Sequence, residues 1–135
     1  MEVWVNKYIA PNMKIINSEK KQGLYYAYFP SGAKMAIFSH GSTEEGASFS
    51  GAFHIYVYPA LSTKTKIIGK DYFTFFYHKS TNFLVEPYKF GWDGTRQSLF
   101  TGPYGCAQNR DTKHYCTTLL QFDNWEVKDD YPIKF

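Results

Sequence analysis

The segment Leu24–Gly41, "LYYAYFPSGAKMAIFSHG", contains two apolar runs separated by Pro30, Ser31 and Gly32. Proline presets the backbone for a turn, and glycine adopts the positive φ angles that many tight turns require. Apolar runs on both sides of such a turn are typical of a β-hairpin. The segment therefore predicts two paired antiparallel strands.

Four further segments also read as strands. In "AFHIYVY" (Ala52–Tyr58) the apolar residues Phe53, Ile55 and Val57 alternate with His54, Tyr56 and Tyr58, which predicts a strand with two different faces. The segments "KDYFTFFYHK" and "FLVEPY", joined by the turn "STN", predict a second hairpin. The apolar run "CTTLLQF" predicts one more short strand near the C-terminus.

The N-terminal segment "MEVWVNKYIAPNMKII" has a different period. Val3, Trp4, Tyr8 and Ile9 recur near helical spacing, and Pro11 should end a helix at about Ala10. The polar segment "NSEKKQGL" then reads as a turn. A helix followed by antiparallel strands is the α+β order, so we expect a single meandering sheet with the helix against one face.

Length and composition set wider limits. The 135 residues fit one domain, residues 1–135, and the 20% aromatic content favours strands. The net charge of +3 is spread along the chain without a basic run, so no nucleic-acid partner is expected. No stretch has the length needed to cross a bilayer, and the first residues lack the features of a secretory signal peptide.

Cys106 and Cys116 are the two cysteines of the chain and enclose nine residues. This spacing differs from the redox C-x-x-C pattern and lacks the second pair of a structural zinc site. A disulfide is therefore favoured over its two alternatives, a free reactive thiol and a metal site that includes His114. A loop of this size would stabilise the fold by roughly 3 kcal/mol and would indicate an oxidising compartment.

The C-terminal segment resembles the end of bacterial type IV pilin-like proteins, which include the pseudopilins of type II secretion. A polar loop between two cysteines is followed by an apolar run, a tryptophan and "DDYP". "KYIAP" (Lys7–Pro11) resembles the end of the long pilin helix, and "IGKDYFTFF" (Ile68–Phe76) resembles a strand segment of the same family. The matching C-terminal residues are Cys106, Cys116, Leu119, Leu120, Trp125, Val127, Asp129, Asp130, Tyr131 and Pro132.

The resemblance implies a fold and a function. The expected fold is the remainder of a long N-terminal pilin helix packed on an antiparallel sheet, with a disulfide-bounded C-terminal loop on the surface. The expected function is that of a structural subunit, not an enzyme, which assembles with other pilin or pseudopilin subunits. The family's apolar N-terminal helix holds the subunit in the bacterial inner membrane before assembly into a periplasmic or cell-surface filament. That helix is absent from this sequence, so the chain corresponds to the soluble headgroup.

The resemblance also raises the question of a metal ion. Major pseudopilins bind calcium near the C-terminus, so Asp123, Asp129 and Asp130 are candidate calcium ligands, with a solvated or capping role as the default. No other cofactor is expected. The four histidines lie far apart in the sequence, and no serine occurs in a G-x-S-x-G motif, so no catalytic residue is predicted.

A second function belongs to another class. The glycine-rich segment "KFGWDGTRQSLFTGPYG" predicts a long loop, and Trp92, Arg96 and Tyr104 are its candidate ligand-binding residues. Exposed aromatic rings with polar neighbours suit a glycan, which would make the chain a secreted or periplasmic carbohydrate-binding module. The alternative is that Trp92 fills space beneath the loop.

Overall fold

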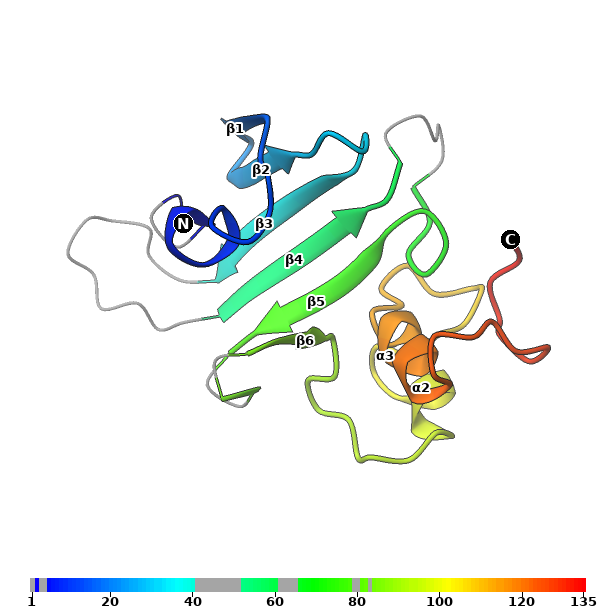
Figure 1. Ribbon diagram of the computed structural model, residues 1–135. Helices are drawn as coiled ribbons and strands as arrows, with labels where there is room; N and C mark the ends of the chain where they lie inside the picture. Colours follow the sequence, from blue (N-terminus) through cyan, green and yellow to red (C-terminus); the bar gives the residue numbers. More distant parts are fainter. Residues whose placement is uncertain (1, 3–4, 41–51, 61–65, 79–80, 83) are drawn as a thin grey trace.

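The computed structural model describes residues 2, 5–40, 52–60, 66–78, 81–82 and 84–135. Its centre is a six-stranded sheet in which each strand pairs antiparallel with the next one along the sequence (Figure 1). The strands are β1 (Asn17–Lys21), β2 (Leu24–Tyr28), β3 (Lys34–His40), β4 (Ala52–Tyr58), β5 (Phe73–Tyr77) and β6 (Val85–Pro87). The helical segments are η1 (Val5–Ile9), α2 (Ser98–Thr101) and α3 (Tyr115–Phe122).

The predicted hairpins are confirmed. Between β2 and β3 the Phe29 N–H donates to the Ala33 carbonyl at 3.0 Å, and Gly32 has a φ of 83°. The predicted strand over Ala52–Tyr58 is β4, and the second hairpin is β5 paired with β6. The sequence predicts these segments because their turns carry glycine, proline or polar residues. Their strands alternate apolar and polar residues or are rich in strand-forming residues.

Strand β1 was not predicted from the sequence. All five of its residues, "NSEKK", are exposed, so no apolar alternation marks the strand. It is held by pairing with β2 across a two-residue turn in which Gln22 and Gly23 both have positive φ angles, 52° and 78°. A turn of this kind matches the twist of paired strands. Lysine and glutamate on an edge strand also discourage pairing with other chains.

The sheet carries a separate hydrophobic core on each face, because successive side chains point to opposite sides. On the first face Phe53 and Ile55 of β4 pack with residues of β2, β3 and the N-terminal segment. Val5 of η1 is fully buried in this cluster. The buried members are Val5, Tyr25, Ala27, Phe29, Met35, Ile37, Phe53 and Ile55.

The C-terminal half of the chain packs on the second face at its β5–β6 end. Figure 1 shows α2 and α3 beside β5 and β6, near the β6 edge of the sheet and far from the β1 edge. Phe76 of β5 packs there with Tyr88 and with residues of both helices. The buried members are Phe76, Tyr88, Leu99, Cys106, Tyr115, Cys116, Leu119, Leu120, Tyr131 and Ile133.

The expected α+β architecture, in which the remainder of a long pilin helix packs on the sheet, is wrong. The structure is mostly a six-stranded sheet with short helices, and η1 is a five-residue π-helical segment. Such a segment is under about 8 Å long, whereas six strands at about 4.8 Å spacing span about 24 Å. The N–H groups of Asn12 and Met13 both donate to the Ile9 carbonyl, so the chain turns there and does not continue the helix.

The predicted strand "CTTLLQF" is also wrong, because this segment lies within helix α3. Thr117 and Thr118 favour strands by propensity, but contacts with other parts of the fold override that preference. The Thr74 N–H donates to Thr117 Oγ1 at 2.8 Å, and Thr118 Oγ1 donates to the Tyr88 carbonyl at 2.5 Å. Since Tyr115 to Leu120 are all buried, the sequence shows no polar face that would reveal a helical period.

The predicted disulfide is confirmed. Cys106 and Cys116 are joined with a Cα–Cα distance of 4.7 Å, and both residues are fully buried. Cys106 follows α2 and Cys116 lies in the first turn of α3, so the bond ties the two helices together.

Gly69 provides a test of the packing around this disulfide. A Cβ atom there would lie 2.6 Å from Cys116 Cβ and 2.6 Å from the Tyr131 hydroxyl. We predict that Gly69→Ala lowers the free energy of unfolding by about 3 kcal/mol, from positive-φ strain plus overpacking. Urea unfolding of the oxidised protein measures the change.

Gly94→Ala is the matched control. Gly94 also has a positive φ angle, 90°, but nothing lies within 4 Å of its added Cβ. This variant should lose only about 1 kcal/mol. Equal losses for the two variants would show that the Gly69 contact is not tightly packed.

Candidate functional site

Two of the three segments on which the expected pilin resemblance was based, Ile68–Phe76 and the C-terminal segment, meet at Gly69. The Tyr131 hydroxyl donates to the Gly69 carbonyl at 2.6 Å, and Cys116 lies against the same glycine. The Gly69 N–H donates to the Tyr72 carbonyl at 2.8 Å. Burial raises the pKa of Tyr131, so its hydroxyl stays a neutral donor. The segment Ile68–Phe76 and the C-terminal segment are therefore packed as one unit.

Helix α3 is held on β5 by further polar contacts. Thr74 Oγ1 lies 3.2 Å from His114 Nδ1, next to the bond between the Thr74 N–H and Thr117. Burial lowers the pKa of His114, which favours the neutral imidazole at physiological pH. A neutral ring fits its surroundings, since His114 packs among the aromatic rings of His54, Tyr88 and Tyr104.

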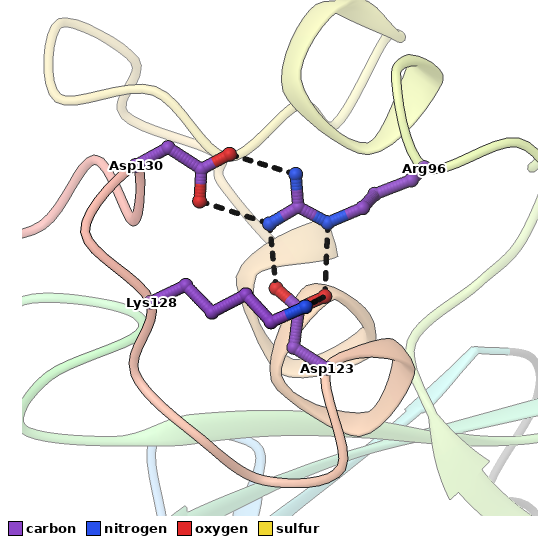
Figure 2. Close-up of polar contacts among 4 residues, drawn as sticks. All are labelled: Arg96, Asp123, Lys128 and Asp130. Carbon is purple, nitrogen blue, oxygen red and sulfur yellow. Dashed lines mark hydrogen bonds and ion pairs between the residues drawn. The ribbon is translucent and has the colours of Figure 1, made fainter.

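Arg96 joins the glycine-rich loop to the C-terminal segment (Figure 2). Its Nε and Nη2 atoms donate to the two oxygens of Asp123 at 2.9 and 2.7 Å. Its Nη1 and Nη2 atoms donate to the two oxygens of Asp130 at 2.7 and 2.9 Å. Lys128 Nζ lies 3.2 Å from Asp123 Oδ1. We call these four residues the Arg96 clasp.

The members of the clasp differ in burial. The Asp123 side chain is 2% exposed, whereas the Asp130 side chain is 55% exposed. Hydrogen bonds from Arg96 lower the pKa of both carboxyl groups. A buried carboxylate that loses its partner is strongly destabilising, while an exposed pair contributes little. The stabilising part of the clasp is therefore the Arg96–Asp123 pair.

The candidate calcium ligands do not form an open cation site. Asp123 and Asp130 direct their oxygens to Arg96, and Asp129 is exposed beside them. In the described ranges no three His, Cys, Asp or Glu side chains gather closely enough to hold a metal ion. The guanidinium takes the place that a cation would have between the two carboxylates.

The candidate glycan residues are not brought together as a single platform. Trp92 Nε1 donates to the Thr95 carbonyl at 2.8 Å, and the indole is edge-on to Phe122. Arg96 is engaged in the clasp. Tyr104 lies elsewhere, with ring centroids 5.1 Å from Tyr88 and 5.8 Å from His114.

Tyr104 instead belongs to a hollow of about 300 Å³ on the second face of the sheet. We call it the aromatic hollow, and its walls include His54, Phe76, His78, Tyr88, Phe90 and Tyr104. A neighbouring hollow of about 460 Å³ shares Phe76 and Phe90 and is also lined by Trp92. Sequence reasoning missed this site, because its walls come from β4, β5 and the segment 88–104, which only the fold brings together. One signal was present in the sequence: the alternation in "AFHIYVY" places His54 and Phe53 on opposite faces of the strand.

The chain belongs to a family of unknown function, DUF6613, whose model matches residues 1–135. No curated protein matches the chain, and no solved structure does. Among the described residues, none of the helices is long and apolar enough to span a bilayer. The functional interpretation therefore depends on the contacts described above.

The Arg96 clasp gives a pH-dependent prediction. Arg96→Met should lower the free energy of unfolding by about 2–3 kcal/mol at neutral pH, less than for a fully isolated buried charge because Lys128 remains. Folding lowers the pKa of Asp123 below its value in the unfolded chain, which is about 3.9. The ionised carboxylate therefore contributes to the free energy of unfolding above about pH 3.9, and this contribution is lost as the pH falls through the pKa of the folded state. The deficit of the variant should therefore shrink below about pH 4. Urea unfolding across this pH range measures it.

Lys128→Met is the matched control, because the Lys128 side chain is 51% exposed. It should lose no more than about 1 kcal/mol. If Arg96→Met lowers the free energy of unfolding at neutral pH by no more than Lys128→Met does, the assigned role of Arg96 is contradicted.

Proposed function

We propose that this chain is the extracytoplasmic domain of a filament subunit of the pilin or pseudopilin type. The proposed role is structural: the domain packs against other subunits and displays a surface, and it carries out no reaction. Before assembly the subunit is held in the bacterial inner membrane, and after assembly it lies in a periplasmic or cell-surface filament.

The observation that carries the proposal is the contact between two of the three segments that resemble pilins, Ile68–Phe76 and the C-terminal segment. They are 30 or more residues apart in the sequence, yet Gly69 touches Cys116 and accepts from Tyr131, and Thr74 bonds to Thr117. These two segments, to which we ascribe the pilin resemblance, therefore form a single structural unit. This supports common ancestry more strongly than two independent local matches would.

The disulfide supports the proposed location. Disulfides persist in oxidising compartments and are rare in the cytosol of mesophiles. The bond also anchors the polar segment between the cysteines, in which Gln108, Asn109, Asp111 and Thr112 are exposed. A covalently anchored, solvated loop suits a displayed surface.

The C-terminal segment offers candidate contact residues. Trp125 and Val127 are 56% and 53% exposed, and Val127 lines a surface hollow together with Arg96 and Asp130 of the clasp. Exposed apolar side chains in a polar rim are typical of an interface. We assign to these residues part of the lateral contact between subunits.

The open reading frame provides the first test. The proposal requires that the native gene product carry about twenty apolar residues and a prepilin-type leader ahead of Glu2. A native product that begins at Met1 would contradict the proposal.

Immunogold labelling provides the second test. Antibodies raised against the chain should decorate filaments on or within the envelope of the source bacterium, and a strain in which the gene is deleted should show no decoration. The variant Trp125→Ala should reduce filament assembly while leaving the fold intact, because Trp125 is mostly exposed. Labelling confined to the cytoplasm would contradict the filament proposal.

A further inference from the structure

We propose that the aromatic hollow binds a neutral saccharide. The hollow is lined mainly by aromatic rings, with polar groups from histidine and tyrosine among them. Its volume of about 300 Å³ is at the lower end of the range for small-molecule sites. The inference does not depend on the proposed filament role, because it concerns a cavity within one chain.

The walls of the hollow hold one another in place. His54 of β4 lies with its ring centroid 5.3 Å from Phe76 and 5.2 Å from Tyr88. Phe76 is in turn 5.9 Å from Phe90. Phe76 and Tyr88 are 5% and 3% exposed and belong to the second core. The floor of the site is therefore preorganised by packing, which reduces the entropy lost on binding.

Phe90 supplies an apolar surface for a ligand. Its side chain is 49% exposed, although it packs edge-on against Phe76 and His78. The C–H face of a pyranose ring is apolar and fits against an aromatic face, while its hydroxyl groups point outward. A half-exposed ring at the rim of a hollow suits such a contact.

The polar groups of the walls match hydroxyl groups. A tyrosine hydroxyl can both donate and accept a hydrogen bond, as a sugar hydroxyl does, and an imidazole ring has two nitrogens that form hydrogen bonds. His54, His78, Tyr88 and Tyr104 supply four such side chains. Burial, together with a hydrogen bond with Tyr104, raises the pKa of Tyr88, so this hydroxyl is neutral.

The charge of the walls selects against ionic ligands. Among the residues that the structure describes, none that lines the aromatic hollow is Asp, Glu, Lys or Arg. For a quaternary ammonium ligand the hollow offers aromatic ring faces, but its described walls hold no carboxylate to balance the charge. For an anion the described walls hold no Lys or Arg side chain. A planar apolar compound would offer no hydrogen-bonding group to the imidazole and hydroxyl groups of the walls. A neutral polyhydroxy ligand avoids each of these costs.

The neighbouring hollow extends the site. It meets the aromatic hollow at Phe76 and Phe90 and adds Trp92, Lys89 and Asp93. Two hollows that share an exposed ring fit two consecutive sugar units, one on each side of Phe90. The structure therefore points to an oligosaccharide rather than a single sugar.

An NMR titration of the whole chain tests the inference. The probes are four neutral trisaccharides (cellotriose, maltotriose, mannotriose and tri-N-acetylchitotriose), with indole and tetramethylammonium as comparison ligands. At least one trisaccharide should cause saturable shifts of the His54, His78 and Tyr104 amide signals. Phe90→Ala should weaken that binding by about tenfold or more, and Tyr104→Phe by about fivefold.

Trp125→Ala is the matched control, because Trp125 is an exposed aromatic residue that lines neither hollow. It should leave the affinity unchanged. The proposal is overturned if none of the trisaccharides binds, if only indole or tetramethylammonium binds, or if Phe90→Ala and Trp125→Ala have equal effects. Because the titration uses unassembled chain, its failure leaves the filament proposal intact, and a failure of filament labelling leaves the titration result intact.

Discussion

The Cys106–Cys116 disulfide is the constraint on which the second face of the fold depends. Helices α2 and α3 have four and eight residues, too short to be stable alone in water. The bond fixes the start of α3 beside the end of α2, where the Cys106 N–H also donates to the Leu99 carbonyl at 2.7 Å. With α3 in place, its threonines reach β5 and the Tyr88 carbonyl, and Tyr131 reaches Gly69.

Much of the sheet could be predicted from the sequence, because local turn chemistry and alternation mark hairpins. The segments that were missed lack these signals. Strand β1 is polar along its whole length, and only its pairing with β2 makes it a strand. Helix α3 is buried on nearly every side and contains two threonines, so neither its period nor its propensity indicates a helix. The N-terminal segment has helical spacing, and among its described residues η1 spans Val5–Ile9 and is followed by a turn, so the segment does not continue as a long helix.

The candidate site could be predicted only in part, since a site depends on contacts between distant segments. The disulfide was predictable because the chain has just two cysteines. Arg96 and Asp123 are 27 positions apart, and nothing local shows that they pair. Tyr104 was nominated with Trp92, yet the fold places it with Tyr88 and His114 instead. The fold contains two separate features: the disulfide-linked C-terminal unit, for which we propose a role in assembly, and the aromatic hollow, for which we propose a ligand.

The state of the two cysteines in the native protein tests the central claim most directly. The protein should be isolated from its source cells without reductant, denatured in the presence of an alkylating reagent and weighed intact by mass spectrometry. A structural disulfide formed outside the cytoplasm predicts that no alkyl group is added. If alkyl groups are added at both Cys106 and Cys116, the thiols are free in the cell, and the covalent basis of this account is contradicted.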